Sequence, residues 1–443
     1  MKNLYFLITT AVSAMLLAGC NSTYFEVDTE KLQTEIYEPT AVKYEGLAQS
    51  TVLYLDHSTC VIDAVQNSQV FKALRPNLGQ YCDTLKLIKG SVFESIPLDR
   101  QDNKVSEVLE TIKDDISFAD IRKAVFQICN GNQQAILISD CESYAGTPPT
   151  GRFLDLEPYM SEPFRDWLKK GNTIYIITEP YKEKYKGQVY NKKRFYFLFT
   201  NDYIEAPISH NMLGEIQSLL NDSICTLFKM TNSDVFVQFP KKDVLDENLG
   251  FDVEYKNGFE FISVENSWNE IREYVMKLDK YGEPLPEEKP VPLIKNLLFD
   301  NGENYAIGNI QIVATNITSR YLSLEDNTIE VKDIDISDGF ILDKNAFRNN
   351  KLNVMLTDKI FTEGYLSDEF GGNLIRLDFV IKEVGLTPYD NTIFEWKSIW
   401  NYPEQAICVS KSIDNALRDV AVVPTNPNRR VIHTIFIKTE AYK

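Results

Sequence analysis

Short hydrophobic runs alternate with segments of helical periodicity along residues 49–285. Residues 51–55 and 134–138 are continuous apolar runs, which are typical of strands buried on both faces of a sheet. Residues 118–129 carry apolar side chains at the i, i+3, i+4, i+7 spacing of an amphipathic helix. The alternation predicts an α/β domain with a doubly wound, mostly parallel sheet over residues 49–285. Further strands are expected at 85–96, 173–178, 195–200, 235–239 and 259–264, and further helices at 60–75, 164–170, 212–220 and 268–278.

A stretch rich in Lys and Tyr, residues 181–194, joins the two strands expected at 173–178 and 195–200. We interpret it as an inserted hairpin. It is locally basic in an acidic chain, so it is either a solvated hairpin or a surface that binds a partner.

A proline-rich segment marks the end of the α/β pattern. Residues 281–292 contain four prolines, which are incompatible with a regular helix or central strand. Beyond this linker, strand-like segments are separated by Asn, Asp and Gly turns, and one amphipathic segment follows at 405–420. We therefore expect residues 286–443 to form a β-rich, sandwich-like domain with one packed helix. The strands are expected at 310–314, 329–336, 351–356, 375–384 and 431–438.

The N-terminus has the pattern of an export signal. Lys2 precedes an apolar stretch, which is too short for a permanent membrane span of roughly 20 residues, and the stretch ends in Leu-Ala-Gly-Cys20. This ending resembles the bacterial lipoprotein box. The resemblance implies that residues 1–19 are a signal peptide, that Cys20 is lipidated, and that the chain is anchored in the cell envelope. Residues 20–48, polar and acidic, would be a tether, and Asn21 after Cys20 would favour the outer membrane of a Gram-negative host.

Composition and charge exclude several classes of protein. The chain has 443 residues, 44% of them hydrophobic, which is incompatible with a disordered or fibrous protein. It has 46 Lys and Arg against 64 Asp and Glu, a net charge of −18. Because binding to phosphates needs a surplus of cations, we expect no nucleic-acid partner.

The cysteines and histidines indicate no dense disulfide framework and no zinc site. Six cysteines remain besides Cys20 and three histidines are present, with no Cys-x-x-Cys spacing. Disulfides are permitted in an exported chain, but several of these cysteines sit in apolar runs. Buried free thiols are therefore the expected state.

Three polar stretches follow or precede the predicted elements of the first domain. Asp56-His57-Ser58-Thr59-Cys60 follows the first strand, Ser117 precedes a helix, and Asp140 follows a buried strand. Ligand sites of doubly wound sheets lie outside the carboxyl ends of the strands. We therefore expect these stretches to meet at one edge of the sheet.

This constellation resembles the von Willebrand factor A family, whose metal-ion-dependent adhesion site uses Asp-x-Ser-x-Ser, a later Thr and an Asp that ends a later strand. The resemblance covers about residues 49–285. It implies that Asp56, Ser58, Ser117 and Asp140 hold Mg, Mn or Ca through oxygen, and that the cation binds an acidic group of a partner.

The match has departures. Cys60 stands at the last Ser of the motif, and sulfur is a poor ligand for magnesium. Cys141 and Glu142 follow Asp140 where the family has Gly. A second interpretation therefore stays open, in which Ser58 and Ser117 are only helix N-caps and Asp140 begins a turn.

The resulting hypothesis is a non-enzymatic envelope protein that recognises a protein or glycan partner through a cation-assisted site. One alternative is a metal-assisted hydrolase of phosphoesters or glycans, with Asp56 as nucleophile or ligand. Haloacid-dehalogenase phosphatases have a second Asp where this chain has Ser58, which disfavours that family. Another alternative is a purely structural envelope subunit.

Overall fold

A computed structural model of the chain describes the residues that carry most of these predictions. The expected signal peptide, Cys20, the tether up to residue 46 and Ser117 lie outside the described residues, as do the strand expected at 235–239 and most of the proline-rich linker. The described residues are 47–98, 104–111, 118–145, 152–232, 259–264, 271–276, 292–298, 303–321, 332–343, 351–366, 372–399, 405–423 and 430–441.

A mixed sheet forms the first domain. Its order is β3-β2-β1-β4-β8-β7-β9 across the described strands. β1 is parallel to both β2 and β4, whereas the other neighbouring strands are antiparallel. The order of the first four strands is that of a doubly wound sheet, but the β7–β8 hairpin then places an antiparallel strand beside β4. The bounds are β1 Ala48–Asp56, β2 Thr84–Lys89, β3 Val92–Pro97, β4 Gln133–Ser139, β7 Thr173–Tyr185, β8 Gln188–Thr200 and β9 Thr226–Met230.

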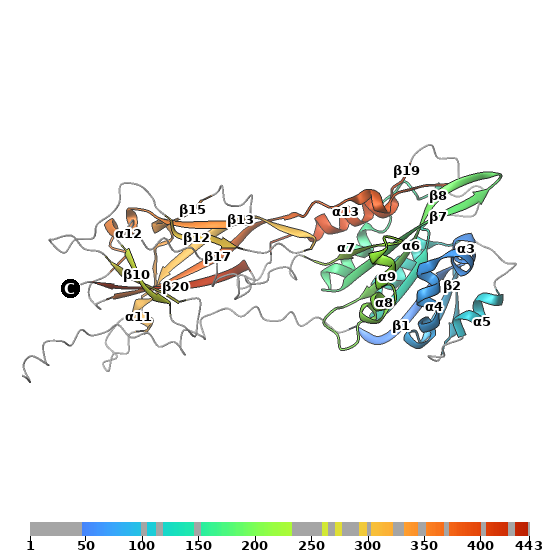
Figure 1. Ribbon diagram of the computed structural model, residues 1–443, viewed down its shortest axis with the longest axis horizontal. Helices are drawn as coiled ribbons and strands as arrows, with labels where there is room; N and C mark the ends of the chain where they lie inside the picture. The colour runs from blue at the N-terminus through green and yellow to red at the C-terminus, as the bar shows by residue number, and fades with distance from the viewer. Residues whose placement is uncertain are drawn as a thin grey trace, which may run out of the picture.

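Helices cover both faces of this sheet (Figure 1). Successive side chains of a strand point to opposite faces, so Leu53 and Leu55 of β1 face one helical layer and Val52 and Tyr54 face the other. The expected α/β architecture is confirmed at this level. The first layer contains α3 Thr59–Asn67, α4 Gln69–Tyr81, α5 Lys104–Thr111, α8 Ile208–Glu215 and α9 Gln217–Asn221, and the second contains α6 Ile121–Asn130, α7 Ser161–Lys169 and α13 Cys408–Val420.

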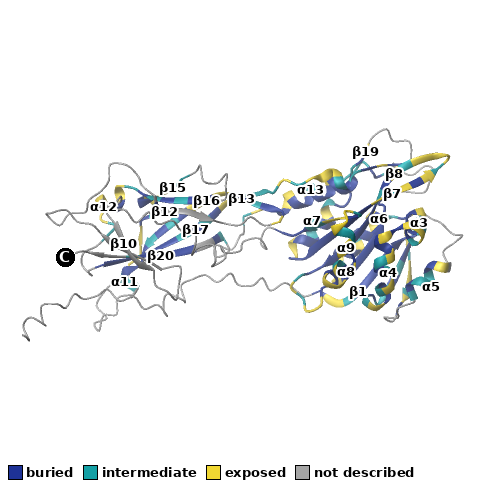
Figure 2. Cartoon of the chain, viewed as in Figure 1, coloured by how far each residue is buried: buried dark blue, intermediate teal, exposed yellow. Residues whose placement is uncertain are grey.

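The rest of the chain is β-rich, as expected. One described sheet has the order β10-β11-β20-β17-β13-β14, and a smaller one has β12-β16-β15. Buried residues run along their strands (Figure 2), and most of these residues are apolar. None of the helices in the described ranges is long and apolar enough to cross a bilayer. The bounds are β10 Phe259–Val264, β11 Ile271–Met276, β12 Pro292–Leu298, β13 Tyr305–Asn316, β14 Ile334–Asp335, β15 Phe340–Leu342, β16 Lys351–Leu356, β17 Gly372–Leu386 and β20 Val431–Ala441.

Short elements connect these strands. They are β5 Tyr144–Ala145, β6 Arg152–Phe153, α11 Thr318–Tyr321, η2 Ser337–Gly339, α12 Lys359–Thr362, η4 Asn391–Phe394, β18 Trp396–Lys397 and β19 Gln405–Ala406.

The helix predicted at 268–278 is wrong, because residues 271–276 form the strand β11. β11 pairs in parallel with β20, Ile271 opposite Phe436. The segment is rich in β-branched and aromatic residues, which favour strands, and the pairing partner lies more than 150 residues away in the sequence. β10 and β11 thus hydrogen-bond within the second sheet, although they precede the boundary that we expected at residue 285.

The helix expected within the second domain packs on the first. The chain leaves β17, runs along the first domain through β18, β19 and α13, and returns to form β20 (Figure 1). The backbone N–H groups of Ile407 and Cys408 donate to the carbonyl oxygen of Asp155, each at 2.9 Å. Trp396 packs against Phe195 of β8, with ring centroids 5.4 Å apart. We call residues 391–423 the returning segment; its described part completes one helical layer of the first domain.

The buried face of α13 is therefore expected to stabilise the first domain. Ile413 is fully buried in the cluster that contains α7 and β8. Replacing it, Ile413→Ala, should lower the free energy of unfolding by about 2–5 kcal/mol, since Ile→Ala leaves a cavity. Hydrogen exchange should speed up in β8 and α7.

The matched control is Val422→Ala, at a side chain that is 55% exposed; it should change stability by less than about 0.5 kcal/mol. Faster exchange confined to β17 and β20 would contradict the assignment of α13 to the first domain.

Candidate functional site

The candidate site lies at the carboxyl ends of β1 and β4. These strands are parallel neighbours, with Leu55 opposite Ile138, so Asp56 and Ser139 end them side by side. After β1 the chain enters α3 on one face of the sheet, and the helix that follows β4, α7, covers the opposite face. This divergence is the switch point at which α/β sheets form ligand crevices.

Asp56 is buried with one carboxylate oxygen lacking a partner. Only 1% of the residue is exposed. The Ser139 hydroxyl accepts from the N–H of Cys141 at 2.8 Å and donates to Oδ2 of Asp56 at 2.7 Å. Oδ1 of Asp56 has no hydrogen-bond partner among the described residues. Burial, together with the charge of Asp140, raises the pKa of Asp56 to about 7.

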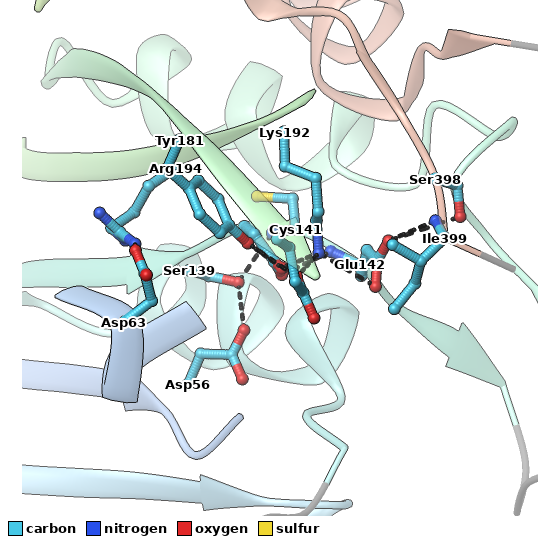
Figure 3. A network of polar contacts seen from close by, with 12 residues as sticks. Asp56, Asp63, Ser139, Cys141, Glu142, Tyr181, Lys192, Arg194, Ser398 and Ile399 are labelled. Carbon is cyan, nitrogen blue, oxygen red and sulfur yellow. Dashed lines mark hydrogen bonds and ion pairs between the residues drawn. The ribbon is translucent and has the colours of Figure 1, made fainter. Parts of the chain in front are cut away.

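Lys192 forms ion pairs with the other carboxylates of the site, and Figure 3 shows it beside Glu142. Its ammonium forms an ion pair with Oδ2 of Asp140, and it lies 3.2 Å from Oε2 of Glu142 and 2.9 Å from Oε2 of Glu183. Burial opposes the charge of Lys192, but these three carboxylates hold its pKa well above the ordinary value. The side chain of Glu142 is 13% exposed, and burial raises its pKa to about 8, although Lys192 opposes this rise.

Asp140 has both oxygens occupied. Oδ1 accepts from the N–H of Glu142 at 3.1 Å, which closes the turn after β4. Oδ2 accepts from the Tyr181 hydroxyl at 2.9 Å as well as from Lys192. The turn predicted at Asp140 is therefore confirmed, and Asp140 also holds the buried ammonium.

The hairpin predicted from the Lys- and Tyr-rich stretch is present as the outer part of β7 and β8. β4 pairs with residues 195–199 of β8 and β9 pairs with residues 174–178 of β7. Residues 179–194 therefore extend beyond both neighbours, and we call them the arm. Tyr181 lies opposite Lys192 in its register. Sequence reasoning missed Lys192 and Glu183, although alternation of buried and exposed positions along the arm marks the face that they share.

A second ion-pair cluster fixes the base of the arm. Arg194 donates to Glu179 at 2.9 Å and to Asp63 at 2.6 Å, and its guanidinium stacks over the Tyr181 ring at 4.4 Å. Glu179 in turn accepts from the Ser68 hydroxyl at 2.6 Å. These contacts tie the arm to α3 and to the start of α4. Their role is to hold the arm, and with it Lys192, in place.

Asp56, Lys192 and the carboxylates that pair with Lys192 surround a pocket of about 250 Å³. The returning segment contributes Ile399, whose N–H donates to Oε1 of Glu142 at 3.2 Å. The pocket therefore joins the sheet edge, the arm and the returning segment. Its lining residues are Asp56, Ser58, Thr59, Phe118, Ala119, Asp140, Glu142, Glu183, Tyr185, Lys192 and Ile399.

Three of the four predicted metal ligands line this pocket. Asp56, Ser58 and Asp140 come together there, and Ser117 lies outside the described residues. Ser58 stands at the N-cap of α3, but its hydroxyl makes no capping hydrogen bond and is buried without a partner in the described structure. The N-cap interpretation thus explains the position of Ser58 but not its side chain.

The described side chains do not fit a divalent cation in their present arrangement. In the described ranges no group of three Asp, Glu, His or Cys side chains is placed to hold a metal ion. A cation between Asp56 and Asp140 would compete with Lys192 for Oδ2 of Asp140. The sulfur of Cys60 is fully buried, and burial raises the pKa of this thiol well above its ordinary value. The predicted use of Mg, Mn or Ca stays a prediction.

The expected state of the cysteines is confirmed. Cys60, Cys82, Cys129, Cys141, Cys225 and Cys408 are all buried free thiols.

Removing the ammonium should convert the pocket into a cation site. Lys192→Ser leaves Asp140, Glu142 and Glu183 unpaired, so it should cost about 3–5 kcal/mol of the free energy of unfolding. Millimolar Mg²⁺ or Ca²⁺ should restore part of this loss, because hard cations bind carboxylate oxygens. Thermal unfolding with and without the cations measures both effects.

The control is Lys193→Ser, at the adjacent half-buried lysine, whose ammonium donates to the carbonyl of Ile393 at 2.6 Å. Neither the control nor the unchanged chain should respond to the cations. Stabilisation of the unchanged chain by Mg²⁺, abolished in Asp140→Ala, would instead support the metal site predicted from the sequence.

No family model matches the chain, and neither a curated protein nor a solved structure matches it. The resemblances to bacterial lipoproteins and to the von Willebrand factor A family remain predictions from the sequence.

Proposed function

We propose that this chain is a lipid-anchored protein of the bacterial cell envelope that binds a partner through the pocket at the ends of β1 and β4. The first domain, von Willebrand A-like in our proposal, is the recognition module. The β-rich region, which we propose to be sandwich-like, extends the module or adds a second contact surface. The observation that carries the proposal is the buried Oδ1 of Asp56, which makes no hydrogen bond with the described residues, in a pocket lined by ion-paired and hydrogen-bonded side chains.

The charges of the pocket support binding over hydrolysis. A hydrolase with two carboxylates needs one as base or nucleophile and another as acid. Here Asp140, Glu142 and Glu183 are all engaged by Lys192, which leaves them poorly suited to exchange protons with a substrate. Asp56, in turn, is held by Ser139. Above the pKa of Asp56, about 7, this arrangement suits a site that presents a charge to a partner.

The proposal of an envelope location rests on the apolar run after Lys2 and on Leu-Ala-Gly-Cys20. Acyl chains on Cys20 would hold the protein at the membrane, since attachment by more than one chain makes membrane binding stable.

Metabolic labelling with an alkyne fatty acid tests the anchor. The full-length chain expressed in a bacterial host should be labelled and found in the membrane fraction, because Cys20 would be acylated. Cys20→Ala should abolish the label, whereas the control Cys225→Ala, at a buried thiol, should retain it. Label retained in Cys20→Ala would contradict the anchor.

Site-specific photocrosslinking in native cells tests the binding function. Benzoylphenylalanine at Tyr185, which lines the pocket, should give a discrete adduct with the partner. The same probe at Val422, 55% exposed at the end of α13, should give none. Asp56→Asn should reduce the adduct at Tyr185 about tenfold, because it removes a buried charge from the contact.

Turnover assays test the alternative function, a metal-assisted hydrolase. The purified chain should not hydrolyse p-nitrophenyl phosphate or p-nitrophenyl glycosides, with or without Mg²⁺. Turnover abolished by Asp56→Asn would refute the binding proposal in favour of a metal-assisted hydrolase. If neither turnover nor an adduct is found, the protein is a structural subunit.

A further inference from the structure

The pocket has an acidic part and an apolar part. Asp56 offers its free Oδ1 in the acidic part. Phe118, Ala119 and Ile399 supply apolar surface, and Phe118 is 40% exposed. A ligand with a charged head and an aliphatic stem matches such a surface, because the stem covers apolar groups while the head keeps polar partners.

Carboxylates outnumber cations around the pocket. Asp56, Asp140, Glu142 and Glu183 line it, and Lys192 is the cation among its described lining residues. Lys192 is engaged by three of these carboxylates and is buried. Asp56 lines the pocket, and above its pKa of about 7 the pocket carries a surplus of negative charge, which attracts a positively charged group and repels an acidic one.

We propose that the pocket binds a lysine side chain of a partner protein, with the lysine ammonium against Oδ1 of Asp56 and the stem along Phe118 and Ile399. The inference rests on the proposed binding function and names its ligand. It differs from a cation-assisted site, in which the partner would contribute an acidic group.

The geometry of Asp56 favours lysine over arginine. An arginine guanidinium pairs best with both oxygens of a carboxylate. Oδ2 of Asp56 already accepts from Ser139 at 2.7 Å, so one oxygen is free. An ammonium, which acts as a point charge with three donors, needs only one oxygen of Asp56. The buried hydroxyl of Ser58, which lies close enough to Asp56 to favour its charged form, can accept a second donor of the same ammonium.

The size of the pocket favours a single side chain. Sites for drug-sized ligands have roughly 300–1,000 Å³, whereas this pocket has about 250 Å³. The apolar wall that Phe118 and Ile399 provide also offers few polar atoms to a sugar. A lysine side chain presented by a protein partner meets both constraints.

Ligand-observed NMR on the full-length chain tests the inference. The probes are acetylated and amidated Gly-X-Gly tripeptides in which X is lysine, acetyl-lysine, norleucine or arginine. The lysine peptide should bind about tenfold more tightly than the norleucine and acetyl-lysine peptides, since these lack the charge. The arginine peptide should bind more weakly than the lysine peptide.

Two variants locate the binding. Asp56→Asn keeps the side-chain shape and should cost the lysine peptide about tenfold in affinity while leaving the norleucine peptide unchanged. Asp419→Asn, at a half-exposed carboxylate of α13, is the matched control and should change neither. The comparison of peptides on the unchanged chain needs no variant, so it stands even if Asp56→Asn does not fold.

Lysine and norleucine peptides of equal affinity would overturn the inference, and so would full lysine affinity in Asp56→Asn. Tighter binding of the arginine peptide would overturn the assignment to lysine. If the photocrosslink at Tyr185 persists while lysine shows no preference, the binding function stands and this ligand is wrong. If both fail, the binding function itself is wrong.

Discussion

The burial of the Lys192 ammonium organises the candidate site. An ammonium taken out of water costs several kcal/mol unless carboxylates and hydrogen bonds compensate it. Asp140 and Glu142 come from the end of β4, and Glu183 comes from the arm. The same ammonium therefore pairs with three carboxylates and fastens the arm to the sheet edge. It leaves Asp56 as the pocket carboxylate with a buried, unpartnered oxygen.

The returning segment makes the pocket dependent on parts of the chain that are far apart in sequence. Ile399 closes one side and donates to Glu142, and α13, which belongs to the same segment, packs on α7. Backbone bonds from Ile407 and Cys408 to Asp155 hold the start of α13. The returning segment connects β17 to β20 and also lines the pocket through Ile399. A displacement of these strands in the β-rich region can therefore move a wall of the pocket.

Much of the local structure could be predicted because periodicity reflects burial. The runs at 51–55 and 134–138 are strands, 118–129 contains the helix α6, and the Lys- and Tyr-rich stretch forms the arm. The meeting of Asp56 and Asp140 also followed, since both end neighbouring parallel strands. The strand β11 was missed although its β-branched and aromatic residues favour a strand, because its pairing partner β20 is far away in the sequence. The packing of α13 was missed because amphipathicity does not identify the surface that a helix covers.

The sequence by itself determined most strands and helices of the first domain and that Asp56, Ser58 and Asp140 line one edge of its sheet, because hydrophobic spacing and strand ends are local properties. The strand expected at 85–96 is instead the hairpin of β2 and β3. Only the tertiary structure decided which side chains contact the oxygens of Asp56, Ser58 and Asp140. Lys192 reaches Asp140 through the register of the hairpin that carries it, and that register depends on contacts between distant segments. The packing of distant segments therefore decides that an ammonium, and not a metal ion, pairs with Asp140 in this structure.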